Sequence, residues 1–274
     1  ASTKQYNIGD VLTIQETKTP KGYKLDTKTY THTVTSGENL ISVSDIPIFD
    51  PPFVLTKVDK DTTTPQGDAT FSGAVFKWEY FPNNDWSGTP ARVWYFATDT
   101  SGRCVYSKDY LAPGYTSDAL YVSPANVNQL PLGTVKITEV KNSLGYTVIP
   151  NSLYCTIAED SSKASGAKHI WTEESKAILT QMANGDWGVY EPIDINLFGS
   201  VAIDKFDAVT GQTPQGEASL AGAVYEVVNS SANPVKVKGK IYAPGDVICE
   251  LTTDAKGHAQ TENIFPVGTY TIRE

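Results

Sequence analysis

The sequence predicts an all-β protein built from tandem β-sandwiches, with at most one short helix. Three observations predict this class. First, the chain contains 15 Tyr among many Val and Thr, which favour strands, and 21 Gly and 16 Pro, which favour turns. Second, short segments alternate apolar and polar residues, as strands with one buried face do. Third, 274 residues are too many for one small domain, so we expect two or three.

The alternating segments are spread over the whole chain. A single stretch, TEESKAILTQMANG (172–185), has helical spacing of its apolar residues, begins with a Thr that can cap a helix, and ends in Asn-Gly. One short helix among many strands is typical of β-sandwiches. The strand candidates, in chain order, are DVLTIQE (10–16), NLISVSD (39–45), GTVKITEV (133–140), SVAIDKF (200–206) and GTYTIRE (268–274).

Composition and charge exclude several classes of function. The formal net charge of −9 argues against nucleic acid or an anionic membrane as partner, because both attract clustered Lys and Arg. No apolar run is long enough to span a bilayer. Cys104, Cys155 and Cys249 lie far apart, and with three His they form no pattern of metal ligands, so we expect neither metal nor cofactor. Cys104 and Cys155 could form a disulfide or remain free thiols.

Internal repeats divide the chain. The segment FVLTKVDKDTTTPQGDATFSGAVFKWEY (53–80) is repeated as SVAIDKFDAVTGQTPQGEASLAGAVYEV (200–227), and both contain a Lys, the tetrapeptide TPQG and Gly-Ala-Val followed by an aromatic residue. A second repeated element is a strand that ends in Glu, and a third is a strand that ends in Asp shortly before the next domain. These acidic residues are Glu16, Glu139 and Glu274 in the first group, and Asp45 and Asp194 in the second.

The order of these elements predicts three units. Residues 1–51 would be the C-terminal part of one domain, residues 52–198 a complete and enlarged domain, and residues 199–274 the N-terminal part of another. The boundaries would lie near Pro51–Pro52 and Phe198–Gly199. Such short linkers favour a stiff linear array. We expect the chain to be a segment of a longer array, with neighbouring domains of the same chain as partners.

These motifs resemble Cna B-type domains, the collagen-adhesin B repeats that also occur as SpaA-type pilin domains in Gram-positive surface proteins. The resemblance covers nearly the whole chain and implies Ig-like (prealbumin-like) β-sandwiches. It also implies a spontaneous isopeptide bond between a Lys and an Asn or Asp, promoted by a buried Glu. In the middle domain Lys57 matches the amine, Glu139 the promoting carboxyl and Asp194 the acceptor.

The outer domains match the same pattern in part. In the third domain Lys205 matches the amine and Glu274 the promoting carboxyl. In the first domain Glu16 matches the promoting carboxyl and Asp45 the acceptor. Many members of the family use Asn as acceptor, whereas this sequence has Asp at both positions.

The chemistry explains the residue types. An amine attacks a carboxyl only when the amine is neutral and the carboxyl is protonated, and burial in a dry core favours both neutral forms. A protonated Glu can hydrogen-bond the acceptor carbonyl and transfer protons. Lys57 and Glu139 each continue an inward-facing apolar row, but Asp194 lies between two Ile that point the other way. Asn196 is therefore an alternative acceptor, and a buried ion pair is the alternative to a covalent bond.

Two functions remain from the sequence. One is a structural stalk segment of a Gram-positive cell-surface or pilus protein, extracellular and attached to the cell wall, with sortase-linked subunits as further partners. The other is an adhesin whose enlarged middle domain binds a host, matrix or carbohydrate ligand. Exposed Trp78, Trp86 and Trp94 would favour the adhesin. No motif of a catalytic or phosphate-binding site is present, so we expect no enzyme activity beyond the single-turnover cross-link.

Overall fold

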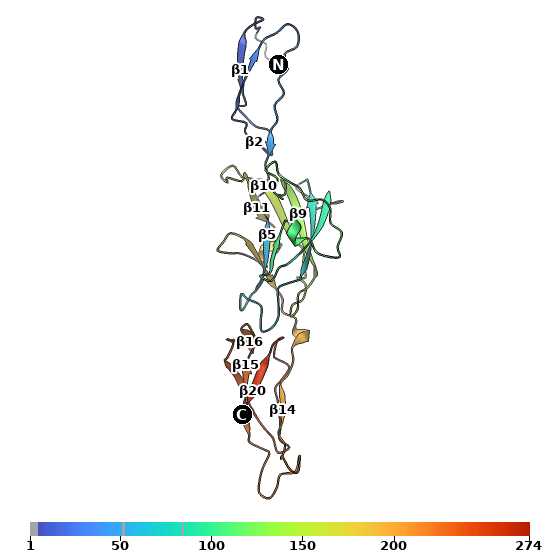
Figure 1. Cartoon of the computed structure of the whole chain (residues 1–274), viewed down its shortest axis with the longest axis vertical. Coiled ribbons are helices and arrows are strands. Elements are labelled where there is room, and N and C mark those ends of the chain that lie inside the picture. The colour runs from blue at the N-terminus through green and yellow to red at the C-terminus, as the bar shows by residue number, and fades with distance from the viewer. Residues whose placement is uncertain (1–4, 51–52, 84) are drawn as a thin grey trace.

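The structure is a computed structural model that describes residues 5–50, 53–83 and 85–274. Three units follow one another along a single long axis, with the two ends of the chain in different terminal units (Figure 1). The prediction of an all-β chain of tandem sandwiches is confirmed. The predicted boundary at Pro51–Pro52 lies outside the described residues.

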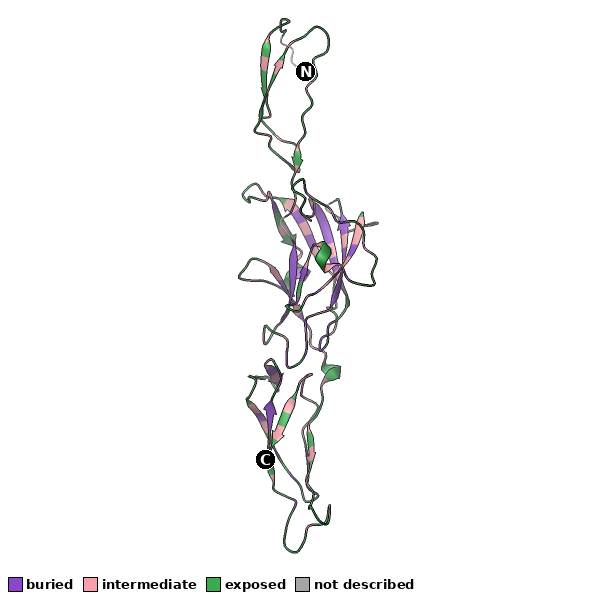
Figure 2. Ribbon diagram, in the orientation of Figure 1, coloured by how far each residue is buried: buried purple, intermediate pink, exposed green. Residues whose placement is uncertain are grey.

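The N-terminal unit is small and thinly packed. Strands β1 (Val11–Gln15) and β3 (Thr29–Thr33) pair antiparallel, and β2 (Tyr23–Lys24) pairs with β4 (Ile46–Pro47). Few of its residues are buried, as the green and pink ribbon of this unit shows (Figure 2). The main-chain N–H of Ile48 donates to the carbonyl of Gly22 at 2.8 Å, and that of Asp50 donates to Leu130 at 2.8 Å. The segment after β4 therefore connects this unit to the middle domain.

The middle domain is a sandwich of two sheets. The five-stranded sheet has the order β11-β10-β9-β6-β7 and the four-stranded sheet the order β12-β13-β5-β8. The first strand, β5, and the last strand, β13, are parallel neighbours, whereas the other pairs are antiparallel. The strands are β5 (Val54–Asp59), β6 (Val75–Phe81), β7 (Arg92–Ala97), β8 (Arg103–Val105), β9 (Gly133–Lys141), β10 (Leu153–Glu159), β11 (Ala167–Trp171), β12 (Leu179–Gln181) and β13 (Trp187–Glu191).

Aromatic side chains dominate the core between these sheets. Trp78 packs against Phe53, Phe96 and Tyr106, and Trp94 packs against Tyr106. All five side chains are almost completely buried. The buried ribbon in Figure 2 is concentrated in this domain. Because buried apolar area is the main source of folding free energy, the middle domain is the most strongly packed unit of the chain.

The C-terminal unit has its own smaller core. Its sheets have the orders β18-β15-β20, β14-β19 and β16-β17. Val227, Val235 and Phe265 are buried at its centre. The strands are β14 (Ala202–Asp204), β15 (Val224–Asn229), β16 (Val235–Val237), β17 (Lys240–Tyr242), β18 (Val247–Thr252), β19 (His258–Gln260) and β20 (Tyr270–Arg273).

Helical structure is short throughout the described chain. The α-helix α1 covers Glu173–Lys176, and its Thr172 cap accepts a hydrogen bond from the N–H of Ser175, as predicted. The helix stops well before Gly185 because residues 179–181 pair with β13 as strand β12. Two 3-10 turns, η1 (Lys108–Tyr110) and η2 (Ile195–Leu197), complete the inventory. Among the described residues, no helix is long and apolar enough to cross a membrane.

Candidate cross-linking site

Strand pairing brings Lys57 between two carboxyl groups. Lys57 lies in β5, inside the four-stranded sheet, and Val189 of β13 is its neighbour in the parallel register. Glu191 ends β13 two residues later, so its side chain leaves the same face as those of Val189 and Lys57. Glu139 comes from β9 of the facing sheet. The three charged side chains thus meet in the space between the sheets.

The distances are those of direct contact. Lys57 Nζ lies 2.8 Å from Glu139 Oε1 and 3.1 Å from Glu191 Oε2, and all three side chains have 0% exposure to solvent. The rings of Phe76 and Tyr146 lie beside the amine, each with its centre 6.0 Å from Nζ. The amine is therefore enclosed by two carboxyl groups and apolar surface, where water cannot screen the charges.

The two carboxyl groups differ in their hydrogen bonds. Glu139 accepts from Lys57 with one oxygen and from the main-chain N–H of Ile149, at 2.8 Å, with the other. Glu191 contacts Lys57 without the alignment of a hydrogen bond, and among the described residues neither of its oxygens has a hydrogen-bond partner. Buried polar atoms are rarely left in this state, so the unpartnered carboxyl of Glu191 requires an explanation.

Burial also changes the protonation of Glu191. Removal from water raises the pKa of Glu191 to about 8, the nearby charge of Lys57 opposes this rise, and that of Glu139 adds to it. Glu191 is consequently protonated at neutral pH. A protonated carboxyl beside an amine, with a second carboxyl group in reach of that amine, is the arrangement that condensation to an amide requires.

The predicted acceptor, Asp194, is not beside Lys57. Strand β13 ends at Glu191 because Pro192 lacks the N–H that would continue the ladder. Asp194 instead caps η2, where its Oδ1 accepts from the N–H and from the side-chain amide of Asn196, both at 3.0 Å. Asn196 is exposed and held in the same turn. Asp194 and Asn196 thus bond to each other in a turn, and the carboxyl group of this segment that contacts Lys57 is that of Glu191.

A signal for Glu191 was present in the sequence. The segment WGVYE alternates, and Val189 and Glu191 share one face. Glu191 is followed directly by Pro192, and Asp45 is followed by Ile-Pro. When the two segments are aligned at their last residues, VSD (43–45) with VYE (189–191), Asp45 corresponds to Glu191.

In the C-terminal unit the predicted pair is in contact. Lys205 Nζ lies 2.8 Å from Glu274 Oε1 and 3.3 Å from the hydroxyl of Tyr225. Hydrogen bonds to Glu274 and Tyr225 raise the pKa of Lys205. This pair differs from the one in the middle domain because its side chains are 31% and 59% exposed. Water therefore stabilises both charged forms.

In the N-terminal unit Glu16 and Asp45 lie near one tyrosine. Glu16 Oε2 accepts from the N–H of Asp26 at 2.7 Å, and the hydroxyl of Tyr30 donates to Asp26 at 2.5 Å. This hydrogen bond, followed by burial and by the charges of Asp26, Asp45 and Glu16, raises the pKa of Tyr30. Glu16 and Asp45 therefore both lie within electrostatic range of Tyr30. Among the described residues, neither forms an ion pair with a Lys.

The aromatic platform that would favour a binding function is not exposed. Trp78 and Trp94 have 0% exposure and belong to the core. Trp86 is half-buried, and its ring packs edge-on against Tyr154 with the centres 5.3 Å apart. The aromatic cluster of residues 78–96 thus stabilises the sandwich.

The cysteines of the described chain are free thiols. Cys104 and Cys155 are buried in the middle domain and Cys249 is half-buried in the C-terminal unit. Burial raises the pKa of both Cys104 and Cys155. High thiol pKa values make these groups unreactive packing residues.

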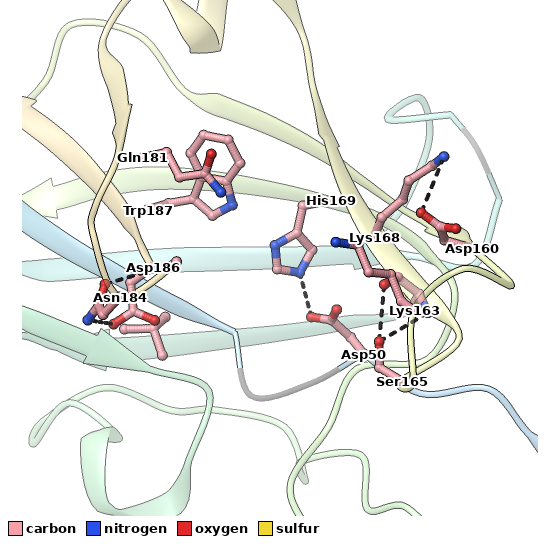
Figure 3. Close-up of a pocket in the computed structure, with 13 residues that line it drawn as sticks. Asp50, Asp160, Lys163, Ser165, Lys168, His169, Gln181, Asn184, Asp186 and Trp187 are labelled. Carbon is pink, nitrogen blue, oxygen red and sulfur yellow. Dashed lines mark hydrogen bonds and ion pairs between the residues drawn. The ribbon is translucent and has the colours of Figure 1, made fainter.

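A polar groove lies on the side of the middle domain near its junction with the N-terminal unit (Figure 3). It has a volume of about 480 Å³ and includes Trp187, Lys163 and Lys168 in its lining. In this groove Nε2 of His169 lies 2.7 Å from Oδ2 of the buried Asp50. Desolvation raises the pKa of Asp50, and the hydrogen bond to His169 opposes the rise. Within the described residues no group of side chains has the composition of a metal site.

The fold has a counterpart among solved structures. This chain is similar in fold to the Bacillus anthracis TIE protein. The two share 17% identity at a TM-score of 0.50, over 96% of this chain and 36% of the TIE chain. This chain thus spans about a third of the TIE chain. An identity of 17% supports likeness of fold alone.

Two pilins were also found. A streptococcal ancillary pilin matches with 16% identity and a TM-score of 0.29, over 96% of this chain and 65% of its own. The minor pilin of Streptococcus agalactiae matches with 15% identity and a TM-score of 0.25, over 82% of this chain and 83% of its own. No protein-family model matches the sequence. No curated protein matches it either.

Proposed function

We propose that the chain is a stalk segment of a Gram-positive cell-surface or pilus protein, in which an amide bond between Lys57 and Glu191 closes the middle domain. The observation that carries the proposal is the buried amine of Lys57 in contact with the unpartnered, protonated carboxyl of Glu191. The extended row of units (Figure 1) suits a spacer that holds other domains away from a wall.

The bond would join the first and last strands of the domain. Because β5 and β13 are parallel neighbours, a pulling force applied at the two ends of the domain shears them past each other. A covalent link between these strands prevents that motion. The bond would close the loop of chain between Lys57 and Glu191. If the entropy treatment used for disulfides applies, closing this loop stabilises the domain by about 4–5 kcal/mol.

The reaction follows from the positions of the three side chains. Glu139 takes a proton from the Lys57 ammonium, which it contacts at 2.8 Å, and leaves a neutral amine. The amine attacks Cδ of the protonated Glu191 and a C–N bond forms. Glu139 returns its proton to the departing hydroxyl of Glu191, the C–O bond breaks, and one water leaves. Glu139 then removes the remaining extra proton from the nitrogen. The Glu191 carboxyl becomes an amide carbonyl, which removes one unpartnered buried oxygen.

The mass of the intact chain tests the bond. We expect the wild-type chain to be lighter than its sequence by one water, and digestion to yield a branched peptide that joins Lys57 to Glu191. Glu191→Gln should still react but release ammonia in place of water, which identifies the acceptor. Glu139→Gln removes the proton carrier and should leave the full unmodified mass.

Matched controls separate this proposal from its alternatives. Asp194→Ala should leave the loss of water unchanged, since Asp194 only caps η2. Glu191→Ala should abolish the loss. An unmodified mass for the wild-type chain would show that the three side chains form a buried ion cluster and no covalent bond. A branch at residue 194 would contradict the assignment of the acceptor.

The adhesin alternative has lost the feature that favoured it, because Trp78 and Trp94 are core residues. On the stalk proposal the protein is extracellular and attached to the cell wall, its partners are neighbouring domains or subunits, and the cross-link is its one reaction.

A further inference from the structure

The TPQG repeat forms the same loop twice. In the first copy the side-chain amide of Gln66 donates to Asp59 at 3.1 Å, and in the second that of Gln215 donates to Asp207 at 3.0 Å. The glycine that follows the Gln has φ of +59° in both copies. The turn that follows is also the same. The N–H of Ala69 donates to the carbonyl of Gln66 at 2.9 Å, and that of Ala218 donates to the carbonyl of Gln215 at 3.0 Å. Two loops with one geometry present the same backbone groups.

The first loop, Thr64–Asp68, is the joint between the middle and C-terminal units. Gln66 and Gly67 are buried by the C-terminal unit. A Cβ atom on Gly67 would lie 2.3 Å from the carbonyl oxygen of Val267, so this contact requires glycine. The hydrogen bonds across the joint run from Gly67 N to Pro234 O, Asp68 N to Val267 O, Asn233 N and Nδ2 to Gly67 O, Lys236 N to Gln66 Oε1, Ala232 N to Asp68 Oδ1 and Thr269 Oγ1 to Asp68 Oδ2.

These bonds make the joint specific. Backbone groups of Gly67 and Asp68 pair with backbone groups of the C-terminal unit, and the Asp68 carboxylate accepts from Thr269 at 2.6 Å. A flexible linker would leave such groups to water. The surface that receives the loop consists of residues 229–237 and 267–269, here called the receiving surface. It lies at the end of the C-terminal unit that faces the middle domain (Figure 1).

The second loop, Thr213–Glu217, has the same shape without a partner in the described chain. Gln215, Gly216 and Glu217 are exposed, and a Cβ on Gly216 would meet nothing within 4 Å. The loop follows β14 and lies at the opposite end of the C-terminal unit from the joint. Glu217 occupies the position of Asp68 and offers the same carboxylate chemistry.

We propose that Thr213–Glu217 is a docking surface for a further domain of the same type, one that presents a receiving surface like residues 229–237 and 267–269. The partner would supply main-chain N–H and carbonyl groups to Gly216, and a hydroxyl and an N–H to the carboxylate of Glu217. The ion pair of Lys236 with Asp61 has no counterpart, because Val209 stands where Asp61 does. The TPQG loop is thus a repeated connector, and it sets the angle between successive domains in the array.

Disulfide capture in the full chain tests the first joint. In a Cys249→Ser background, Asp68→Cys with Thr269→Cys should form an intramolecular disulfide under mild oxidation. Adding Gly67→Ala should lower its yield at least about fivefold, because the loss of each hydrogen bond changes an equilibrium constant by roughly two- to tenfold. Gly216→Ala is the matched control: it places the same Cβ at the same φ but meets no neighbour, so the yield should not change. An equal yield in all three chains would overturn the joint.

The second copy is tested between two chains. Glu217→Cys with Thr269→Cys, in a Gly67→Ala and Cys249→Ser background, frees the receiving surface and should give disulfide-linked chains through residues 217 and 269. Restoring Gly67 should suppress this product, since the chain's own loop then occupies the surface. Addition of Gly216→Val should also suppress it, because the larger side chain obstructs docking. Linkage that is absent, or equal in all three chains, would overturn the proposal.

Discussion

Replacing Lys57 by Met is expected to destabilise the middle domain by about 4–5 kcal/mol at pH 5, the stabilisation that the proposed cross-link would supply. The loss should grow as the pH rises. In the Met variant the fully buried Glu191 stays a free carboxyl group with no cation beside it, and it becomes charged as the pH rises. A buried charge without a partner is among the most destabilising features a core can have.

The sign of the pH dependence follows from Glu191. The pKa of Glu191 is raised from 4.5 to about 8. The charge of Lys57 lowers this pKa, so the pKa of Glu191 rises further when Lys57 is replaced by Met. A group whose pKa is higher in the folded state stabilises the fold below its unfolded pKa, and that stability is lost as the pH rises through the folded value. We therefore expect the free energy of unfolding of the Met variant to fall by about 1.4 kcal/mol per pH unit between pH 5 and 8.

Urea unfolding at several pH values, followed by Trp fluorescence, measures this slope. The control is Lys57→Met with Glu191→Gln, which also lacks the cross-link but has no acid at position 191 and should show a shallower slope. The wild-type chain, in which the proposed bond converts Glu191 to an amide, should show the least dependence on pH. A Met variant as stable as wild type would contradict the covalent bond, and a flat pH profile would contradict the raised pKa of Glu191.

Trp78→Ala is expected to destabilise the middle domain by about 3–5 kcal/mol, which approaches the total stability of many domains. Trp78 has 0% exposure, and its ring packs against Phe53, Phe96 and Tyr106 from both sheets. The surrounding strands cannot close the cavity because they are held in register by two sheets of hydrogen bonds.

The matched control for this prediction is Trp86→Ala. Trp86 is half-buried and contacts Tyr154 at the edge of the sandwich, so its loss should cost much less. Thermal unfolding of each variant, with its cross-link state read from the intact mass, separates the effect of packing from that of the bond. A folded Trp78→Ala chain with unchanged melting temperature would show that the aromatic cluster serves something other than the core.

Local pattern alone determined much of this molecule. Strand alternation placed β1, β9, β14 and β20, since strands that pack on one face repeat with period two, but it was wrong for residues 39–45, which alternate and form no strand. Alternation also placed Lys57 and Glu139 on inward faces, and the repeats paired Lys205 with Glu274. Each of these inferences needs only the phase of one strand or the correspondence of two copies.

Tertiary structure decided which carboxyl meets Lys57. The phase around Asp194 was already weak, but the sequence does not state where β13 ends or that it lies parallel to β5. Pro192 ends the ladder at Glu191, and the parallel register sets Val189 beside Lys57, so Glu191 reaches the amine and Asp194 caps a turn. The joint at Gly67 has the same cause: its partner, Val267, lies far away in the chain, and only the packing of two domains shows why that glycine cannot carry a side chain.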